Sequence, residues 1–186
     1  MCSSDLREGY LVKGDGHTAW QVRRLDLDYF HDLYDLRVNL ELIAIRRICH
    51  ADPFPDLSEQ RDFWLVPEAQ RNLDGQVVAR ADEAFHSALV EGSGNAEMHR
   101  VHRDITERIR IIRRLDFVEP ARIASAYEEH AKLLRALMAR KEERAEMLLK
   151  AHIDASRAEI KHITLHRLSE AARQRATPVA QSKGRS

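Results

Sequence analysis

The sequence between residues 120 and 172 predicts a helical hairpin with its turn near Lys141. Apolar side chains recur at helical spacing on both arms, at Ile123, Tyr127, Leu134 and Leu137 and then at Leu148, Leu149, Ile153, Ile160 and Ile163. His130 lies 11 residues before Lys141, and His152 lies 11 residues after it. Because each arm rises by about 1.5 Å per residue, we expect both imidazoles at one level of the hairpin. Histidines that face each other inside a helix pair need a buried partner, and a metal ion is one candidate.

A second polar pair interrupts the apolar stripe of the helix predicted over residues 74–90. Asp82 and His86 are four residues apart, so they share one helix face, beside Phe85. Together with the two hairpin histidines they form what we call the Asp–His cluster: Asp82, His86, His130 and His152. Imidazoles suit zinc, nickel, iron or copper, and the carboxylate extends the choice to manganese. The alternative is a local surface pair beside core histidines that are held by hydrogen bonds.

Two other histidine pairs also have helical spacing. The chain has 10 histidines, so some pairs are expected by chance. His162 and His166 are four residues apart near the open end of the predicted hairpin, and His99 and His102 are three apart among charged neighbours. We interpret both pairs as parts of solvated helix faces rather than as metal ligands.

Arg37 is another charged residue beside an apolar stripe, on the helix predicted over residues 27–49. A guanidinium there needs a carboxylate, which can come from Glu41 one turn later or from a bound acid. Both alternatives stay open, and Arg37 is a candidate ligand-binding residue. The apolar pattern of the same helix predicts a buried face composed of Phe30, Leu33, Leu36, Leu40 and Ile43.

The rest of the chain completes an all-α pattern. Further helices are predicted over residues 58–72 and 95–115, which gives an antiparallel bundle of about six helices. Residues 1–25 differ, because they hold three of the seven glycines and two short apolar segments around Asp15-Gly16, a pattern that predicts a β-hairpin. Residues 173–186 are small and polar, and we expect a disordered tail there.

The composition excludes several classes of protein. Lys plus Arg and Asp plus Glu both number 30, so the molecule has no overall basic field for nucleic acid. Two cysteines make no disulfide framework, which fits a reducing cytoplasm. The chain shows no signal-peptide pattern, and no apolar run approaches the roughly 18 residues of a membrane span.

Four motifs follow one another along the helical part: residues 33–37 with Glu41, residues 82–89 followed by Ser93-Gly94-Asn95, Glu129-His130 with Leu134, and Ala151-His152-Ile153. In this order they resemble the ligand-binding FCD domain of GntR-type transcription regulators of the FadR subfamily. The resemblance covers about residues 27–171, and the helix count favours the shorter, VanR-like branch. It implies a helical bundle, a divalent metal held by the Asp–His cluster, a small carboxylate effector at that metal, and a homodimer.

The N-terminal part departs from that family pattern. Regulators of this kind carry a winged helix-turn-helix before the ligand-binding domain, whereas residues 6–22 resemble only its wing hairpin. The helices that would enter the major groove are missing from this sequence. We therefore expect residues 1–25 to be a wing-like remnant and linker, residues 26–172 the FCD-type domain, and residues 173–186 a tail.

Three functions remain to be compared. The first is an effector-sensing domain that binds a divalent metal and a small carboxylate. Zinc is the first choice of metal, ahead of nickel, manganese or iron. In this interpretation the protein contacts DNA only through a winged helix-turn-helix, which is mostly missing from this sequence. The alternative is a metal-dependent hydrolase or lyase acting on a small organic acid, although no second carboxylate or nucleophile has the spacing of a general base. The third is a helical interaction protein whose metal site is structural.

Overall fold

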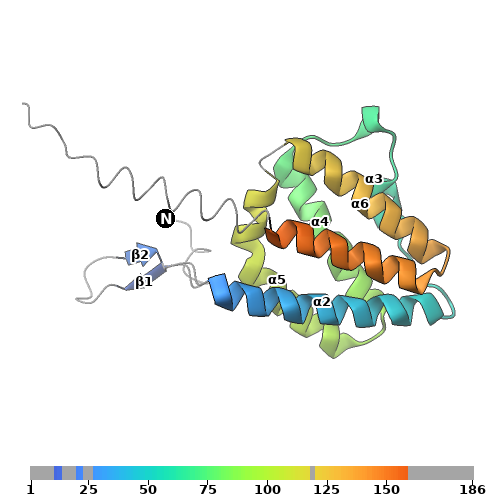
Figure 1. Cartoon of the computed structure of the whole chain (residues 1–186), viewed down its shortest axis with the longest axis horizontal. Coiled ribbons are helices and arrows are strands. Elements are labelled where there is room, and N and C mark those ends of the chain that lie inside the picture. The colour runs from blue at the N-terminus through green and yellow to red at the C-terminus, as the bar shows by residue number, and fades with distance from the viewer. Residues whose placement is uncertain (1–10, 14–19, 23–26, 118–119, 159–186) are drawn as a thin grey trace, which may run out of the picture.

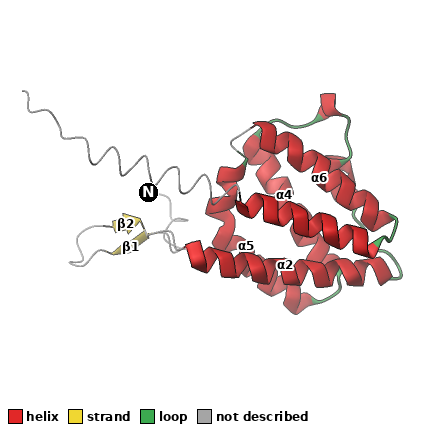
Figure 2. Cartoon of the chain, viewed as in Figure 1, coloured by secondary structure: helices red, strands yellow, loops and turns green. Residues whose placement is uncertain are grey.

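The computed structural model describes residues 11–13, 20–22, 27–117 and 120–158. Six α-helices in that part build a bundle, which confirms the all-α prediction (Figures 1 and 2). They are α2 (Leu27–His50), α3 (Ser58–Trp64), α4 (Gly75–Gly92), α5 (Ala96–Asp116), α6 (Pro120–Met138) and helix 142–158, with a short 3-10 helix, η1 (Glu68–Gln70), between α3 and α4. None of the helices described is long and apolar enough to cross a membrane.

Helix α2 buries a face that differs from the predicted stripe. Buried positions follow one another every three or four residues from Leu33 to Cys49, and Arg37 and Glu41 are among them. Leu36 and Ile43, which were predicted to be inside, are 46% and 39% exposed. The prediction was wrong because two charged residues that neutralise each other occupy the inner face and leave two apolar residues outside.

The helix boundaries follow the polar and glycine signals of the sequence. The side chain of Asp74 accepts hydrogen bonds from the first turn of α4, and Asn95 accepts one from Met98 at the start of α5. Between these helices Gly94 has a φ of 72°, a conformation that glycine adopts without strain. The sequence predicts a weaker helix over residues 58–72 with a disturbance at Pro67, which has no N–H to donate to a helix. The structure breaks there, into α3 and η1, so the predicted helix was too long.

The predicted hairpin is formed by α6 and helix 142–158. The reversal passes through Arg140, which has a φ of 54°, and Lys141 N–H donates to the carbonyl of Ala136 at 2.9 Å. The guanidinium of Arg140 donates to the carbonyls of Cys49 and Ala51 at 3.0 and 2.8 Å. These bonds fix the turn against the end of α2, and helix 142–158 then runs back alongside α2 (Figure 1).

An aromatic group joins α3 to the hairpin and to α4. Trp64 is 2% exposed, and its ring stacks on His130 with a centroid separation of 4.0 Å and an interplanar angle of 12°. Tyr127 and Phe85 complete the surroundings, with centroids 5.0 and 6.3 Å from Trp64. The core therefore holds the imidazole of His130 in one orientation. Because Trp64 is buried, its side chain cannot contact another molecule.

Near the N-terminus, β1 (Leu11–Lys13) and β2 (Trp20–Val22) pair antiparallel, with Leu11 opposite Val22 and Lys13 opposite Trp20. A hairpin was predicted at this place. Its turn, the expected linker, His162, His166 and the expected tail lie outside the described residues.

Candidate metal centre

The structure brings all four residues of the Asp–His cluster together inside the bundle. Asp82 and His86 come from α4, His130 from α6 and His152 from helix 142–158. One donor atom of each lies within 4.8 Å of the others, and all four residues are buried. The His130 and His152 rings are 4.5 Å apart, as their equal offsets from the hairpin turn predict. Sequence spacing therefore placed the cluster correctly, whereas its role remains a prediction.

The separations between the donor atoms suit a single ion. Oδ1 of Asp82 lies 3.1 Å from Nε2 of His130, 3.5 Å from that of His86 and 3.7 Å from that of His152. The Nε2 atoms of His86 and His152 are 3.1 Å apart. Ligand atoms held about 2.1 Å from one ion are separated by roughly 3 to 3.5 Å, and these four separations of 3.1 to 3.7 Å are close to that spacing.

The hydrogen-bond partner of Nδ1, the ring nitrogen that faces away from the centre, indicates the tautomer of each imidazole. Nδ1 of His86 lies 2.5 Å from the Glu41 carboxylate, Nδ1 of His152 lies 2.6 Å from Glu129, and Nδ1 of His130 lies 2.7 Å from the carbonyl of Ala126. Since these oxygens accept hydrogen bonds, we infer that each Nδ1 carries the proton. Each Nε2 then presents a lone pair to the centre, as in metal sites whose histidines are oriented by carboxylates or carbonyls.

Two buried atoms at the centre have no hydrogen-bond partner in the structure: Oδ1 of Asp82 and Nε2 of His130. Lone pairs that face each other without a proton or cation between them are unfavourable, and a buried acceptor without a partner costs about 1–3 kcal/mol. A divalent cation satisfies all four donors at once. The residues therefore fit a transition metal with imidazole and carboxylate ligands.

Burial keeps the imidazoles in the neutral form that metals require. It lowers the pKa of His152 to about 4 and the pKa of His130 well below its usual range, and it also lowers the pKa of His86. The pKa of Glu41 lies well below its usual value although burial opposes this, because the charge of Arg37 and a hydrogen bond from His86 favour the carboxylate. An ionised Glu41 facing a neutral His86 is the arrangement that strengthens a metal-binding imidazole.

Behind the cluster, Glu41 joins two further groups. One oxygen accepts from Arg37 Nε at 2.7 Å and lies 3.0 Å from Nε2 of His102. The prediction that His99 and His102 form a solvated pair was wrong for His102, which is fully buried. Its position three residues before Ile105, on the stripe that α5 packs inward, was a signal for this placement. His99 is half-buried and lies 2.9 Å from the hydroxyl of Ser87.

Arg37 has the internal partner that the sequence suggested, because its Nε donates to Glu41. Its Nη2 is buried and has no hydrogen-bond partner in the structure. The guanidinium is therefore only partly satisfied, and one donor remains for another acceptor.

Sequence reasoning missed residues that support the cluster from outside. Glu129 was noted only as the neighbour of His130, yet it points to His152, and Arg122 donates to it at 3.0 Å. Arg113 of α5 forms a buried ion pair with Oδ2 of Asp82. The contacts of Glu129 with His152 and of Arg113 with Asp82 join separate helices, so sequence spacing within one helix gave no sign of them.

Comparison with known proteins gives the family of the chain. Residues 32–155 match the FCD domain. The chain belongs to the FCD-domain family of GntR-type transcription regulators. It is 32% identical over 146 residues to the Nta operon transcriptional regulator of Aminobacter aminovorans, which is 78% of this chain and 68% of that protein. An uncharacterized HTH-type transcriptional regulator of Bacillus subtilis is 18% identical over 166 residues, or 85% of this chain and 71% of that protein.

Solved structures of GntR-family regulators have the same fold. One from Rhodococcus sp. RHA1 superposes with a TM-score of 0.67 at 22% identity, covering 85% of this chain and 75% of that one. Another, from Pseudomonas syringae pv. tomato, has a TM-score of 0.55 at 20% identity, covering 91% and 69%. Fold and relatives therefore confirm a regulator domain rather than the alternative hydrolase or lyase.

Proposed function

We propose that this FCD domain senses a small organic acid through a divalent metal held by the Asp–His cluster. The observation that carries the proposal is the convergence of three Nε2 lone pairs and one carboxylate oxygen, two of them without any other partner. Zinc is the first choice, because three imidazoles and a carboxylate match its ligand preferences, and nickel, manganese or iron are alternatives.

The effector in this proposal is a carboxylate. A metal with four protein ligands retains coordination positions for an acid when it expands its sphere, and such a cation binds carboxylate oxygens well. Arg37 lies beyond Glu41 from the cluster, and its partnerless Nη2 supports a role as a second contact for the acid. Since His86, Glu41 and Arg37 form one hydrogen-bonded chain, a ligand at either end affects the packing of α2 against α4.

In a regulator, ligand binding changes DNA affinity only when the protein has two conformations that differ in DNA affinity and also bind the ligand with different affinities. The wing-like hairpin and the linker precede α2, so we propose that changes in α2 are transmitted in that direction. In this proposal such a regulator acts on DNA in the cytoplasm as a homodimer, and it contacts DNA through a winged helix-turn-helix.

The metal assignment is tested by metal analysis of the purified protein. One equivalent of divalent metal is expected per chain, and His130→Ala or His152→Ala should remove most of it. His31→Ala is the matched control, because His31 is exposed on α2, and its metal content should equal that of the parent. Equal loss from all three variants would contradict the assignment.

The effector is tested by thermal-shift titration with mono- and dicarboxylates. An acid that binds at the metal should stabilise the metal-loaded protein more than the stripped protein, and Arg37→Ala should lose part of the gain. Equal stabilisation with and without metal would show that the acid does not use the metal.

A further inference from the structure

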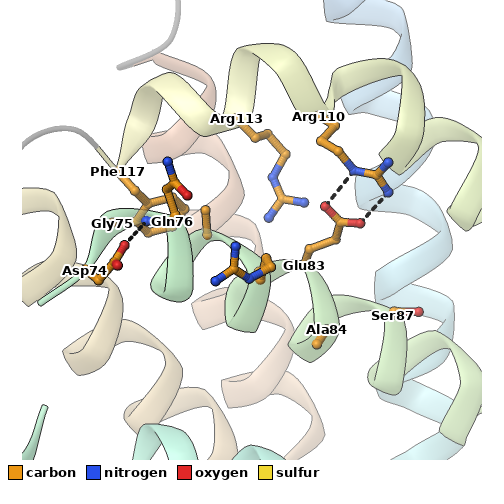
Figure 3. Close-up of a pocket in the computed structure, with 11 residues that line it drawn as sticks. Asp74, Gly75, Gln76, Glu83, Ala84, Ser87, Arg110, Arg113 and Phe117 are labelled. Atoms are coloured by element: carbon orange, nitrogen blue, oxygen red, sulfur yellow. Dashed lines mark hydrogen bonds and ion pairs between the residues drawn. The ribbon is translucent and has the colours of Figure 1, made fainter. Parts of the chain in front are cut away.

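A cavity of about 840 Å³ lies between α4 and α5, outside the Asp–His cluster (Figure 3). Its wall is formed by Asp74, Gly75, Gln76, Ala79, Arg80, Glu83, Ala84, Ser87, Arg110, Arg113 and Phe117. Volumes of this size are typical of small-molecule sites. Neither Arg37 nor any residue of the Asp–His cluster lines this cavity.

Three arginines give the cavity a cationic wall. Arg110 makes two hydrogen bonds to Glu83, at 3.0 and 2.6 Å, and Figure 3 shows the pair facing each other across the gap between the helices. Arg80 is exposed. Of the two acids in the wall, Asp74 already accepts from the first N–H groups of α4. The wall therefore carries three guanidinium groups and two carboxylates, and guanidinium groups favour carboxylate and phosphate-like anions.

Arg113 connects this cavity with the candidate metal centre. Its side chain, only 8% exposed, forms an ion pair with Oδ2 of Asp82, while Oδ1 of the same carboxylate faces the imidazoles. Figure 3 shows Arg113 reaching from α5 toward α4 at the wall of the cavity. One carboxylate thus separates the two sites and interacts with both.

We propose that the α4–α5 cavity is a second ligand site, for a small anion with a carboxylate, sulfate or phosphate group, and that anion and metal bind with positive cooperativity. Without metal, the charge of Asp82 is taken up by Arg113. A divalent ion on Oδ1 draws that charge away, so Arg113 becomes a stronger partner for an anion in the cavity. By linkage, the anion must raise the metal affinity by the same factor. The cooperativity rests on the metal site proposed above, whereas the anion site does not.

The test is calorimetric titration of the full chain with sodium sulfate at constant ionic strength, stripped and loaded with Zn²⁺. The parent should bind sulfate about fivefold or more tightly when loaded, which is the lower end of ordinary coupling between sites. Arg110→Gln and Arg80→Gln should each weaken binding severalfold. Arg108→Gln is the matched control, since Arg108 lies on α5, pairs with Asp104 and is not part of the cavity wall.

Each outcome separates the two proposals. Sulfate binding that is unaffected by both Arg110→Gln and Arg80→Gln, or lost on Arg37→Ala instead, would overturn the cavity site. Equal sulfate affinity with and without Zn²⁺ would overturn the cooperativity. A protein that takes up no metal would contradict the proposed function, and the arginine variants in the stripped protein would still decide the cavity. Circular dichroism verifies that each variant is folded, and Arg80→Gln changes only an exposed side chain.

Discussion

At the residue scale, the centre of this domain depends on groups that are costly to bury alone. Asp82 and the three histidines were found from the sequence because two helical spacings and the symmetry of a hairpin place them. Glu41 and Glu129 were not assigned to the cluster, although they determine which ring nitrogen faces it. Their role depends on how helices pack against one another, and periodicity within one helix does not contain that information.

The neutral histidines predict how stability changes with pH when no metal is bound. Burial depresses the pKa of His152 to about 4, so between about pH 6.5 and 4 the unfolded chain binds a proton that the folded chain does not. The free energy of unfolding should therefore be highest above pH 6.5 and fall with decreasing pH, by about 3 kcal/mol at pH 4 from His152 alone. Urea unfolding of stripped protein measures the slope.

Two variants locate the source of that slope. His152→Gln should reduce the slope between pH 6.5 and 4, to which His130 and His86 still contribute, while His31→Gln, which changes an exposed histidine, should leave it as in the parent. A stability that stays constant from pH 7 to pH 4.5 in the stripped parent would show that the imidazoles are not buried in the neutral form.

At the element scale, the sequence predicted where helices begin and end more reliably than which face of α2 is buried. Helix starts and ends are marked by local residue preferences, which do not depend on how the helices pack. The residues concerned are Asp74, Asn95, Pro120 and the glycines near residue 94. The face of α2 was mispredicted because Arg37 and Glu41 are inward only as a pair, in contact with His86 and His102 of two other helices. Hydrophobic periodicity reads such residues as solvated.

The contact between α4 and α5 gives a prediction about packing. A Cβ on Gly75, the first residue of α4, would overlap the backbone carbonyl of Phe117. Gly75→Ala should therefore force the end of α5 away and destabilise the domain by about 1–3 kcal/mol. The control is Gly94→Ala, which meets no atom within 4 Å and costs only the strain of a positive φ, about 1 kcal/mol. Chemical denaturation would compare both, and equal losses would contradict the steric explanation.

At the scale of the whole molecule, α2 exposes apolar side chains along one face. Tyr29, Leu36 and Ile43 are spaced by seven residues and are 38%, 46% and 39% exposed. A seven-residue repeat on one helix face suits packing against another helix. We propose that a homodimer would use this face, so Leu36→Glu should produce monomers in sedimentation equilibrium. Leu73→Glu, at an isolated position that is 76% exposed, should leave the association unchanged.

The set of helices and strands described above also bears on DNA binding by this 186-residue chain. Sequence readout needs an element that reaches base edges, usually a helix in the major groove. The six helices described all belong to the bundle, and β1 and β2 are paired strands of only three residues each. With 30 basic and 30 acidic residues, nonspecific attraction to DNA is also weak.

We therefore predict that the chain by itself does not distinguish DNA sequences. Fluorescence anisotropy at about 150 mM salt, where a few phosphate contacts give only weak binding, would compare the region upstream of its own gene with a scrambled duplex of equal length. Equal, weak and salt-sensitive binding to both is expected, with the bundle still folded and able to take up metal. Sub-micromolar binding that prefers the upstream region would mean that residues 1–25 contain a DNA reader, contrary to their length, their glycine content and the short strands found there.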